Sequence, residues 1–509
     1  MAAGPRGDRL SILRKLGANS SIYASTNVLQ RGAAFLLMPL YTHYLEPSAY
    51  GVLAIVTAVN GILSIVFTLG LTSAITRFYF EYQDDPPMLA QFWGSILVFV
   101  LLLSATLAGL LLLTGEVLLR PLIGDVPFWP FVALGVMATF FQPFFSAFLA
   151  VLQMRNQAAR FAAVSLANFA LTTVLTIALL VQMGWGVRAP LIATLVTSAV
   201  FFFVSFWLLR DDLQLCLRWS HLKLALGYSL PLVPHSVSSQ VTAVVDRLVL
   251  NSYLGTAAAG LYSVGAMLAL VVEVLAQSVN RAYVPLTMGA LKRGQPADIE
   301  QIRTAGTVFV GLFCVLGAGV AGYAPELLWL MASAAYAPAA VVVPFLVFAG
   351  VANAFYLIFV NVMFYDRSAV RLIPLGTVTS ALICLGLSLV LVPAFGLMGA
   401  AVAAVLGQTL AAILIAVVAY RYEQVRWSYA RQALAFGLSL ATALGLSRLD
   451  AGSLAANIAL KLLGLGCLAS VVGMLLWKQP RLFGRALLEL LHGRPRAAAA
   501  ILLDGATPT

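Results

Sequence analysis

The sequence predicts an all-α polytopic membrane protein with about 14 transmembrane helices, arranged as two six-helix lobes and an appended C-terminal helix pair. The first observation is composition. Of the 509 residues, 61% are hydrophobic and 10% are charged, whereas soluble domains have about 45–50% apolar and about 25% charged residues. The second observation is a succession of apolar segments of membrane-spanning length. The third is a hairpin sequence that occurs twice. This composition excludes an ordinary soluble enzyme.

Fourteen apolar segments are separated by turn-like sequences such as YQDDPP at 82–87 and KRGQPAD at 292–298. Each segment is long enough for a helix to cross a hydrocarbon core of about 30 Å. The predicted spans are residues 20–44, 50–78, 91–114, 128–153, 160–183, 187–209, 225–250, 257–285, 304–330, 336–364, 371–393, 397–420, 430–447 and 453–477.

The positive residues indicate the orientation of these spans. When the N-terminus is placed in the cytoplasm, 23 of the 30 Lys and Arg residues fall on the inner side and three on the outer side. Cytoplasmic loops of membrane proteins are enriched in positive charge. The distribution therefore favours fourteen spans with both termini cytoplasmic, and it accounts for the net charge of +11 without a nucleic-acid partner. The acidic loop after the second span (Glu81, Asp84, Asp85) departs from this pattern.

An internal repeat predicts the two lobes. YLEPSAYGVL at 44–53 matches YLGTAAAGLY at 253–262, an offset of 209 residues, and GVRAPLIA at 186–193 matches GLMGAAVA at 396–403, an offset of 210. The first pair joins spans 1–2 and 7–8, and the second pair opens spans 6 and 12. Because each unit has an even number of spans, both enter the membrane in the same direction. The sequence thus predicts parallel repeats related by an axis along the membrane normal.

The predicted domain organisation follows from the spans and the repeat. A cytoplasmic N-terminal arm precedes the N-lobe, a cytoplasmic interfacial linker joins the lobes, and two further spans precede a cytoplasmic tail. In the tail, RLFGRALLELL at 481–491 has the pattern of a helix lying in the headgroup plane. The boundaries are 1–19 for the arm, 20–210 for the N-lobe, 211–224 for the linker, 225–420 for the C-lobe, 421–477 for spans 13 and 14, and 478–509 for the amphipathic segment and tail.

Polar residues at helical spacing mark spans 1, 2, 7 and 8, the first two spans of each repeat. A charged side chain at the centre of a bilayer costs from about 2.5 to more than 10 kcal/mol, so it faces protein or water and not lipid. We therefore expect a shared wet cavity as the substrate-binding site. Its candidate residues are Asn27, Arg31, Asn60, Glu273, Gln277, Asn280 and Arg281.

Other polar residues have more than one interpretation. Asp246 and Arg247, near the outer end of span 7, are candidates for a gate or coupling pair, or for an interfacial anchor. His235 follows two prolines, and there a structural role is as good an interpretation as a functional one. Glu273 and Arg31 fall at similar depth, so the sequence predicts either an ion pair or a proton-binding carboxylate. The hydroxyl residues of span 2 (Thr57, Ser64, Thr68) equally suit helix–helix hydrogen bonding.

No cofactor, metal or catalytic residue is expected. The four cysteines are scattered without a CxxC pair, which gives neither a disulfide framework nor a zinc site. The sequence is compatible with coupling to protons, to sodium or to the membrane potential.

Two stretches carry a family resemblance. SSIYASTNVLQRGAAFLLMPLYTHYLEPSAYGVLAIV at 20–56 and YSLPLVPHSVSSQVTAVVDRLVLNSYLGTAAAGLYSVG at 228–265 resemble bacterial polysaccharide-export flippases, similar to O-antigen flippases. These belong to the multidrug/oligosaccharidyl-lipid/polysaccharide exporter superfamily. The resemblance implies a transporter of a polyprenyl-diphosphate-linked oligosaccharide, located in the bacterial inner membrane. It also implies membrane lipids and other polysaccharide-assembly membrane proteins as partners. Arg31 and Arg281 match the kind of position at which the family's cavities carry positive charge.

Two other classes compete with this reading. A cation-coupled drug or small-molecule antiporter of the same superfamily would use buried carboxylates, and Glu273 fits either class. A membrane glycan polymerase or glycosyltransferase is less favoured, because the predicted outer loops have only on the order of 5–15 residues. We therefore expect a transporter and not an enzyme.

Overall fold

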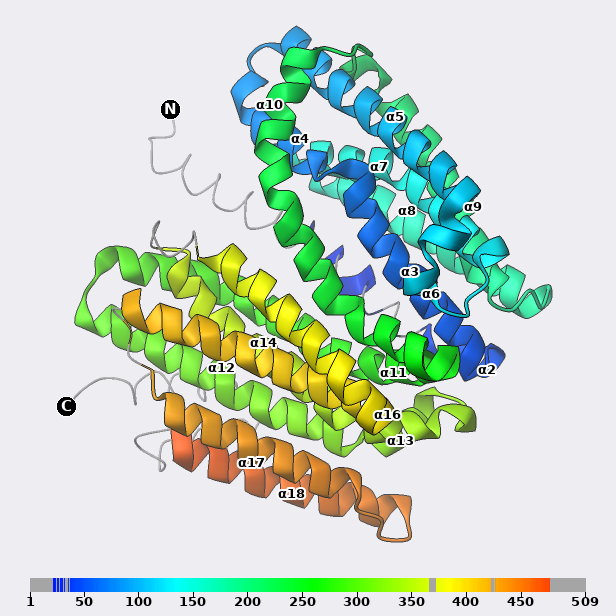
Figure 1. Ribbon diagram of the computed structural model, residues 1–509. Coiled ribbons are helices and arrows are strands. Elements are labelled where there is room, and N and C mark those ends of the chain that lie inside the picture. The colour runs from blue at the N-terminus through cyan, green and yellow to red at the C-terminus, as the bar shows by residue number, and fades with distance from the viewer. Residues whose placement is uncertain are drawn as a thin grey trace, which may run out of the picture. The chain divides into compact units, whose positions relative to one another are not determined.

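The computed structural model describes residues 22–365, 372–422 and 425–476, apart from residues 24, 27, 31, 33, 34, 36 and 426. Every regular element within these residues is a helix (Figure 1). The all-α prediction is therefore confirmed for the described chain. The predicted arm at 1–19 and the predicted tail at 478–509, with its amphipathic segment, lie outside the described residues.

The helices form two compact units, residues 1–260 and 261–509. The division falls one helix later than the linker predicted at 211–224, because residues 233–254 pack with the first unit. The predicted division into lobes and linker itself stays a prediction.

The described part of the first unit contains nine α-helices and the first part of a tenth, which continues into the second unit. One π-helical turn precedes α7 (Phe128–Val132), another follows α8 (Ala178–Gln182), and 3₁₀ turns lie at Arg210–Asp212 and Leu230–Leu232. The α-helices are α2 (Met38–Tyr44), α3 (Pro47–Thr68), α4 (Leu71–Tyr82), α5 (Pro86–Leu118), the short α6 (Arg120–Ile123), α7 (Ala133–Met154), α8 (Ala158–Ile177), α9 (Arg188–Leu209), α10 (Trp219–Ser229) and α11 (Val233–Arg293).

The segment predicted as one span at 50–78 is in fact two helices, α3 and α4. The chain breaks at Leu69 and Gly70, which have φ angles of 47° and 67°. Such left-handed backbone cannot continue a right-handed helix, and glycine adopts it at little cost. The sequence prediction missed this break because the apolar pattern continues across it.

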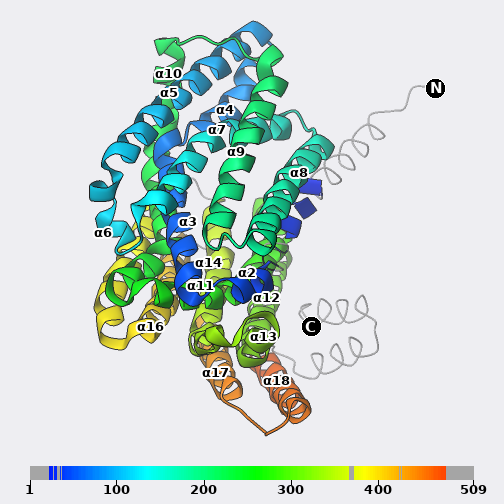
Figure 2. The same ribbon diagram turned by 90° about the vertical axis from the view of Figure 1, so that its right-hand side faces the viewer.

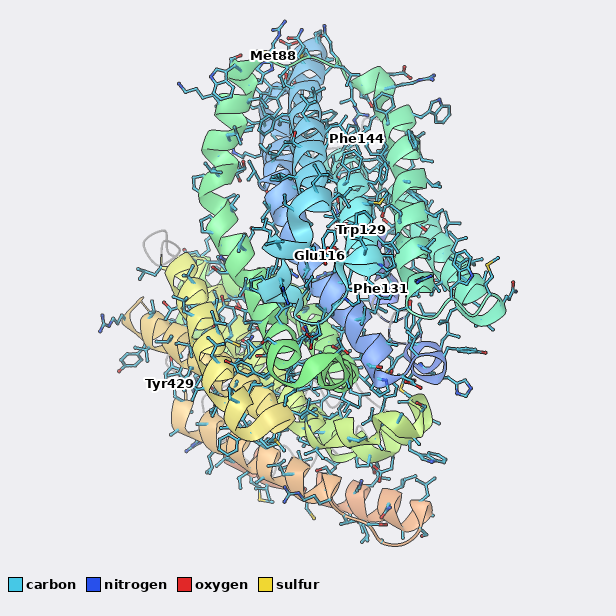
Figure 3. All side chains as sticks on the ribbon, turned by 45° about the vertical axis from the view of Figure 1, so that its right-hand side comes forward. Met88, Glu116, Trp129, Phe131, Phe144 and Tyr429 are labelled. Carbon is cyan, nitrogen blue, oxygen red and sulfur yellow. The ribbon has the colours of Figure 1, made fainter. Side chains whose placement is uncertain are left out.

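Long antiparallel helices with large apolar side chains build the core of this unit. Figure 3 shows Met88 and Glu116 at opposite ends of α5, and Trp129 and Phe144 in the opposite order along the neighbouring α7 segment. A buried cluster joins α4, α5, α7 and α8, and its largest members are Phe78, Phe92, Trp93, Phe144, Phe148 and Phe161.

An ion pair closes the predicted inner end of this unit. The Arg155 guanidinium, just beyond α7, donates two hydrogen bonds to the Asp212 carboxylate after α9, at 2.6 and 2.7 Å. The same guanidinium lies over the Trp93 ring, 5.5 Å from its centroid. The hydrogen bonds to Asp212 raise the pKa of Arg155 above its usual value. A bidentate geometry of this kind fixes orientation as well as charge.

The second unit contains the rest of α11 and six further α-helices. Figures 1 and 2 show α17 and α18 lying side by side. A 3₁₀ segment at Ala334–Val341 precedes α14. The α-helices are α12 (Pro296–Gly322), α13 (Ala324–Met331), α14 (Val343–Met363), α16 (Ile373–Tyr422), α17 (Tyr429–Ser447) and α18 (Leu454–Leu476).

Two long helices are interrupted where the sequence predicted loops. α11 is non-helical at Gly255 (φ 78°) and α16 at Gly396 (φ 59°). Gly186 and Gly396, which are equivalent in the predicted repeat, both have positive φ, at 53° and 59°. In the described part of the chain ten helices are long and apolar enough to cross a membrane, two of them containing these breaks. The count of fourteen spans stays a prediction.

A buried ion pair ties the last helix of the second unit to the rest of it. Lys461 of α18 is completely buried, and its Nζ donates to Glu326 Oε1 of α13 at 2.5 Å. The ammonium also lies 5.6 Å from the centroid of the Tyr323 ring. The Tyr323 hydroxyl in turn donates to the Ile458 carbonyl of α18 at 2.9 Å. The contacts from α13 and Tyr323 therefore hold α18 at a fixed register.

We predict that this pair behaves as a unit when it is mutated. Lys461→Met alone should lower stability by about 3–5 kcal/mol, because it leaves a carboxylate without its partner. The double variant Lys461→Met/Glu326→Gln should recover most of that loss. Thermal melting in detergent measures the effect, with Glu81→Gln as the control, since the Arg77–Glu81 pair is about half exposed. Equal melting temperatures for the single and the double variant would contradict the coupling.

Candidate functional site

Two of the predicted cavity residues, Arg31 and Asn27, lie outside the described residues. The other predicted residues divide between the two units, with Asn60, His235, Asp246 and Arg247 in the first and Glu273, Gln277, Asn280 and Arg281 in the second. The contacts of each group are those within its own unit.

The structure places Asn60 at a close contact between α3 and α7. A Cβ at Gly135 of α7 would lie 2.6 Å from Asn60 Oδ1 and 2.7 Å from Nδ2, so the missing side chain of Gly135 makes room for the amide. Asn60 Oδ1 is buried and has no hydrogen-bond donor among the described residues. An unpaired buried carbonyl costs about 1–3 kcal/mol. Asn60 is thus a buried polar side chain whose carbonyl oxygen can still accept a hydrogen bond.

The hydroxyl groups of the α3 stripe are satisfied within their own helix. Thr57 donates to the Leu53 carbonyl, Ser64 to Gly61 and Thr68 to Ser64, at 2.7–2.8 Å. Side chains bonded in this way need no partner on another helix. The structure therefore gives these three residues no role in joining helices.

The predicted gate residues lie beside α3 in the first unit. Asp246 is 8% exposed, and Arg247 and His235 are half-buried. Arg247 is near enough to the buried Tyr50 hydroxyl for an electrostatic interaction, and its Nε is buried without an acceptor among the described residues.

In the second unit, Glu273, Gln277 and Arg281 follow one another at four-residue spacing along α11. Glu273 and Gln277 are half-buried and Arg281 is exposed. Glu273 makes no ion pair with any other described residue. Its predicted pairing with Arg31 stays a prediction because Arg31 lies outside the described residues.

Asn280 has a partner that the sequence analysis did not identify. Asn361 of α14 is 2% exposed, and its Nδ2 donates to Asn280 Oδ1 at 2.6 Å. The hydrogen bond braces the polar face of α11 against α14. Asn361 was missed because it stands almost alone in an apolar span and forms no periodic stripe. A lone asparagine near the end of such a span was the one available signal.

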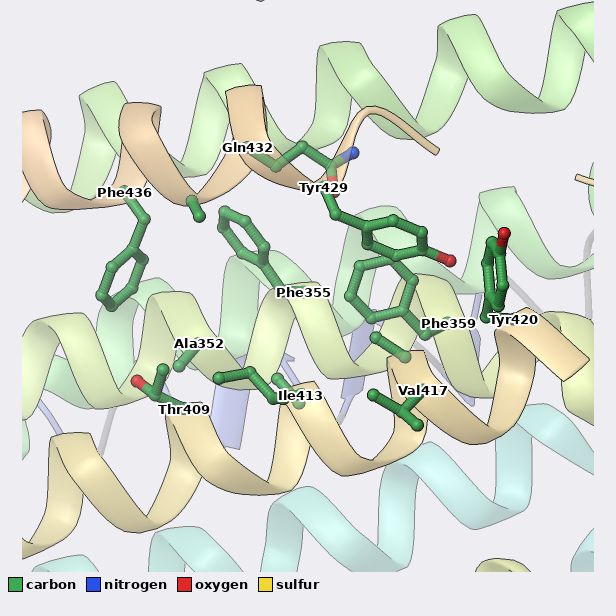
Figure 4. Close-up of a pocket in the computed structure, with 13 residues that line it drawn as sticks. Ala352, Phe355, Phe359, Thr409, Ile413, Val417, Tyr420, Tyr429, Gln432 and Phe436 are labelled. Atoms are coloured by element: carbon green, nitrogen blue, oxygen red, sulfur yellow. The ribbon is translucent and has the colours of Figure 1, made fainter. Parts of the chain in front are cut away.

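An apolar groove lies between α14, the second half of α16 and α17 (Figure 4). Its volume is about 510 Å³, within the range of about 300–1,000 Å³ that is usual for ligand sites. Phe355 and Phe359 of α14 pack against Phe436 and Tyr429 of α17, and together these rings form one wall of the groove. The ring centroids of Phe359 and Tyr429 are 5.6 Å apart, and those of Phe355 and Phe436 are 5.8 Å apart. The sequence analysis did not predict this groove.

One polar side chain stands out in the groove wall. Gln432 of α17 is 3% exposed, and its Oε1 is buried without a donor among the described residues. Alanines, Ile413 and Val417 of α16 make up most of the opposite wall. The groove therefore suits an aliphatic or aromatic group, and it holds one free hydrogen-bond acceptor.

The described helices have the arrangement of solved all-α membrane proteins of two kinds. The structure of the lipid II flippase MurJ in an inward closed conformation matches with a TM-score of 0.67 at 16% identity, over 89% of this chain and 98% of that chain. A multidrug resistance MATE family transporter of the MOP superfamily in an inward-facing conformation matches with a TM-score of 0.62 at 19% identity, over 76% and 93%. These likenesses establish the fold.

The family follows from the sequence itself. Residues 16–288 match the family model described as polysaccharide biosynthesis protein, which is more than half of the chain, so the protein belongs to that family. A Haemophilus influenzae protein described as Lsg locus putative protein 1 is 26% identical over 359 residues, covering 69% of this chain and 85% of the relative. The resemblance that the sequence predicted is thereby confirmed.

We predict that Asn280 and Asn361 are energetically coupled. Asn361→Ala should lower stability by about 0.5–1.5 kcal/mol, the net value of one such hydrogen bond. Asn280→Ala should cost a similar amount, and the double variant should cost little more than either single one. Asn353→Ala, on the same helix, serves as the uncoupled control. Additive losses for Asn280 and Asn361 in melting experiments would show that the bond contributes nothing.

Proposed function

We propose that this protein is a flippase that moves a polyprenyl-diphosphate-linked oligosaccharide across the bacterial cytoplasmic membrane for cell-surface polysaccharide export. It works by alternating access through a cationic central cavity. The observation that carries the proposal is the apolar groove of the second unit, in a chain of the polysaccharide biosynthesis family. A lipid-linked glycan needs a site for a long hydrocarbon tail as well as one for a polar head. Membrane lipids and other polysaccharide-assembly proteins are its expected partners.

The groove accommodates the tail of the proposed substrate. Within a bilayer an aliphatic chain gains little hydrophobic free energy from leaving lipid, since lipid tails are equally apolar. The groove therefore serves to hold the tail in a defined position, and it contributes little to drawing the tail out of the lipid. The aromatic rings of Phe355, Phe359, Tyr429 and Phe436 give it stiff walls. An ordered tail keeps the polar head at a constant position relative to the helices that move.

Positive charge receives the diphosphate in this proposal. Arg281 is exposed, so it is free to contact an anionic head group, and Arg31 supplies the second guanidinium. A planar guanidinium binds phosphate oxygens in pairs. Glu273 lies two turns from Arg281, about 12 Å along the helix, and it either pairs with Arg31 in the empty cavity or takes up a proton. Both termini are proposed to lie in the cytoplasm.

Substitution of Arg281 tests the charge. Arg281→Ala should reduce flipping of a fluorescent polyprenyl-diphosphate oligosaccharide in proteoliposomes by roughly 10- to 100-fold, the value of a hydrogen bond to a charged group. Arg281→Lys should keep part of the activity, because Lys retains the charge without the planar fork. Arg160→Ala is the control, since this exposed guanidinium donates to the Gln157 amide oxygen of the same helix start, at 3.2 Å, and makes no ion pair with another described residue. Full activity of Arg281→Ala at normal abundance would exclude Arg281 from the site.

A second substitution tests the groove. Ile413 lines the groove and is 50% exposed, so Ile413→Trp should fill the groove without disturbing the core. We expect about a tenfold loss of flipping, equivalent to about 1.4 kcal/mol. Leu414 is 37% exposed on the same helix but is not part of the groove, and Leu414→Trp should leave flipping unchanged. Equal rates for the two tryptophan variants would argue against tail binding.

The rival function, a cation-coupled drug antiporter, is favoured by the free acceptor of Gln432. An amphiphilic organic cation with an N–H group would satisfy this oxygen, whereas a polyprenyl tail has no hydrogen to donate. The variant Gln432→Leu distinguishes the two functions when transport of both kinds of substrate is measured in the same assay. A flippase should tolerate it, and a drug antiporter should lose affinity for its N–H-bearing substrates.

A further inference from the structure

The two copies of the repeated hairpin contact each other through their glycines. Gly51, in the second turn of α3, and Gly260, just after the break in α11, are 209 residues apart and equivalent in the repeat. A Cβ at Gly51 would lie 1.8 Å from the carbonyl oxygen of Thr256. A Cβ at Gly260 would lie 1.9 Å from the carbonyl oxygen of Pro47. Thr256 and Pro47 are themselves equivalent by the same offset, so the contact is reciprocal.

The glycines are required by this contact and not by their backbone conformation. Both are helical, and neither has a positive φ angle. The opposing atoms are backbone carbonyls, which cannot turn aside as a flexible side chain can. Small residues allow membrane helices to cross with their backbones in contact, where Cα–H groups meet carbonyl oxygens at about 3.3–3.6 Å. We call Pro47, Gly51, Thr256 and Gly260 the glycine crossing.

The residues around the glycine crossing are buried, and they make further contacts within the first unit. Tyr50 and Ala259, beside the two glycines, are 4% and 0% exposed. Asn251 of α11 donates to the Ile123 carbonyl of α6 at 2.7 Å. Arg247 interacts with Tyr50. In the predicted topology all these residues lie near the outer surface of the membrane.

A point of rotation lies next to the glycine crossing. Gly255 has φ 78° and ψ 179°, backbone that glycine adopts far more readily than other residues. The helical hydrogen bonding of α11 is therefore broken between the helix that ends before Gly255 and the turn that starts at Thr256. Hinges in transporters and enzymes are residues of this kind, at the ends of elements.

We propose that the glycine crossing is the outer gate of the transporter, closed in this structure, and that it parts when the cavity opens outward. The repeat explains why the gate is symmetric: each lobe contributes one glycine and one carbonyl. Because the surfaces are backbone, the gate closes without charged groups that would have to be stripped of water in every cycle. The proposal rests on the transport activity proposed above, but it makes a conformational prediction that needs no substrate.

Distance measurements by double electron–electron resonance test the gate. Tyr44 and Tyr253, equivalent residues in the two hairpins, are 47% and 53% exposed, so Tyr44→Cys and Tyr253→Cys can carry spin labels. Cys216 and Cys467 are replaced by Ser, while Cys314 and Cys384 are buried and stay. Gly51→Ala must push the helices apart by roughly 1.5 Å to restore a normal contact. Steric relief alone predicts a shift of about that size, whereas a destabilised gate predicts a second population at clearly longer distances. We expect the second population in Gly51→Ala and in Gly260→Ala.

Gly109→Ala is the matched control, because a Cβ at this position in α5 meets nothing within 4 Å. It should leave the distance distribution unchanged. If Gly51→Ala and Gly260→Ala are folded, as judged by a monodisperse peak in gel filtration, and show no second population at longer distances, the glycine crossing is only packing and the proposal is wrong.

A second experiment leaves both glycines in place. Bifunctional maleimides that join the thiols of Tyr44→Cys and Tyr253→Cys should stop flipping in proteoliposomes, and a cleavable linker should restore it. Undiminished flipping by fully crosslinked protein would overturn the proposal even if the alanine variants do not fold. If the protein does not flip the substrate even before crosslinking, the proposed function is wrong. The spin-label distances of the glycine variants then test the gate independently of that function.

Discussion

Polar groups inside this protein must find their partners within the chain, because a bilayer offers none. The structure meets this constraint in three ways. Hydroxyls bond to carbonyls of their own helix, as Thr57 and Thr68 do. Amides and charges pair across helices, as Asn361 does with Asn280 and Lys461 with Glu326. Where neither occurs, glycine lets backbone meet backbone, as at Gly51 and Gly260. Helix positions, and hence the candidate sites, depend on these contacts.

The groups that escape this constraint are the ones that suggest function. Asn60 Oδ1, Arg247 Nε and Gln432 Oε1 are buried without partners among the described residues. A stable fold gains nothing from such groups. These three lie on α3, α11 and α17, and other buried atoms without a partner among the described residues are spread over α5, α8, α9 and α10. Their distribution alone therefore does not mark a site, and Asn60, Arg247 and Gln432 are of interest because they also lie beside the predicted gate residues or the apolar groove.

The sequence predicted the fold class correctly, and the reasons are physical. Apolar length identifies helices because a bilayer permits little else, and the loops predicted before residues 257 and 397 coincide with the breaks at Gly255 and Gly396. The break at Leu69 and Gly70 was missed because hydropathy does not report backbone angles. Polar stripes located Asn280 but not Asn361, and the Lys461–Glu326 pair joins residues 135 positions apart, beyond the reach of any periodicity. The apolar groove was invisible because its residues look like ordinary membrane-facing residues in sequence.

The buried pair of Lys461 and Glu326 has a consequence for the biogenesis of this chain. Glu326 is synthesised 135 residues before its partner, so it enters the membrane while α18 does not yet exist. Until α18 arrives, the carboxylate of α13 must remain near water or be shielded by another polar group. A chain that stops before α18 would leave the Glu326 carboxylate without its ammonium partner. The last contact of α13 within the membrane therefore forms only when α18 is in place.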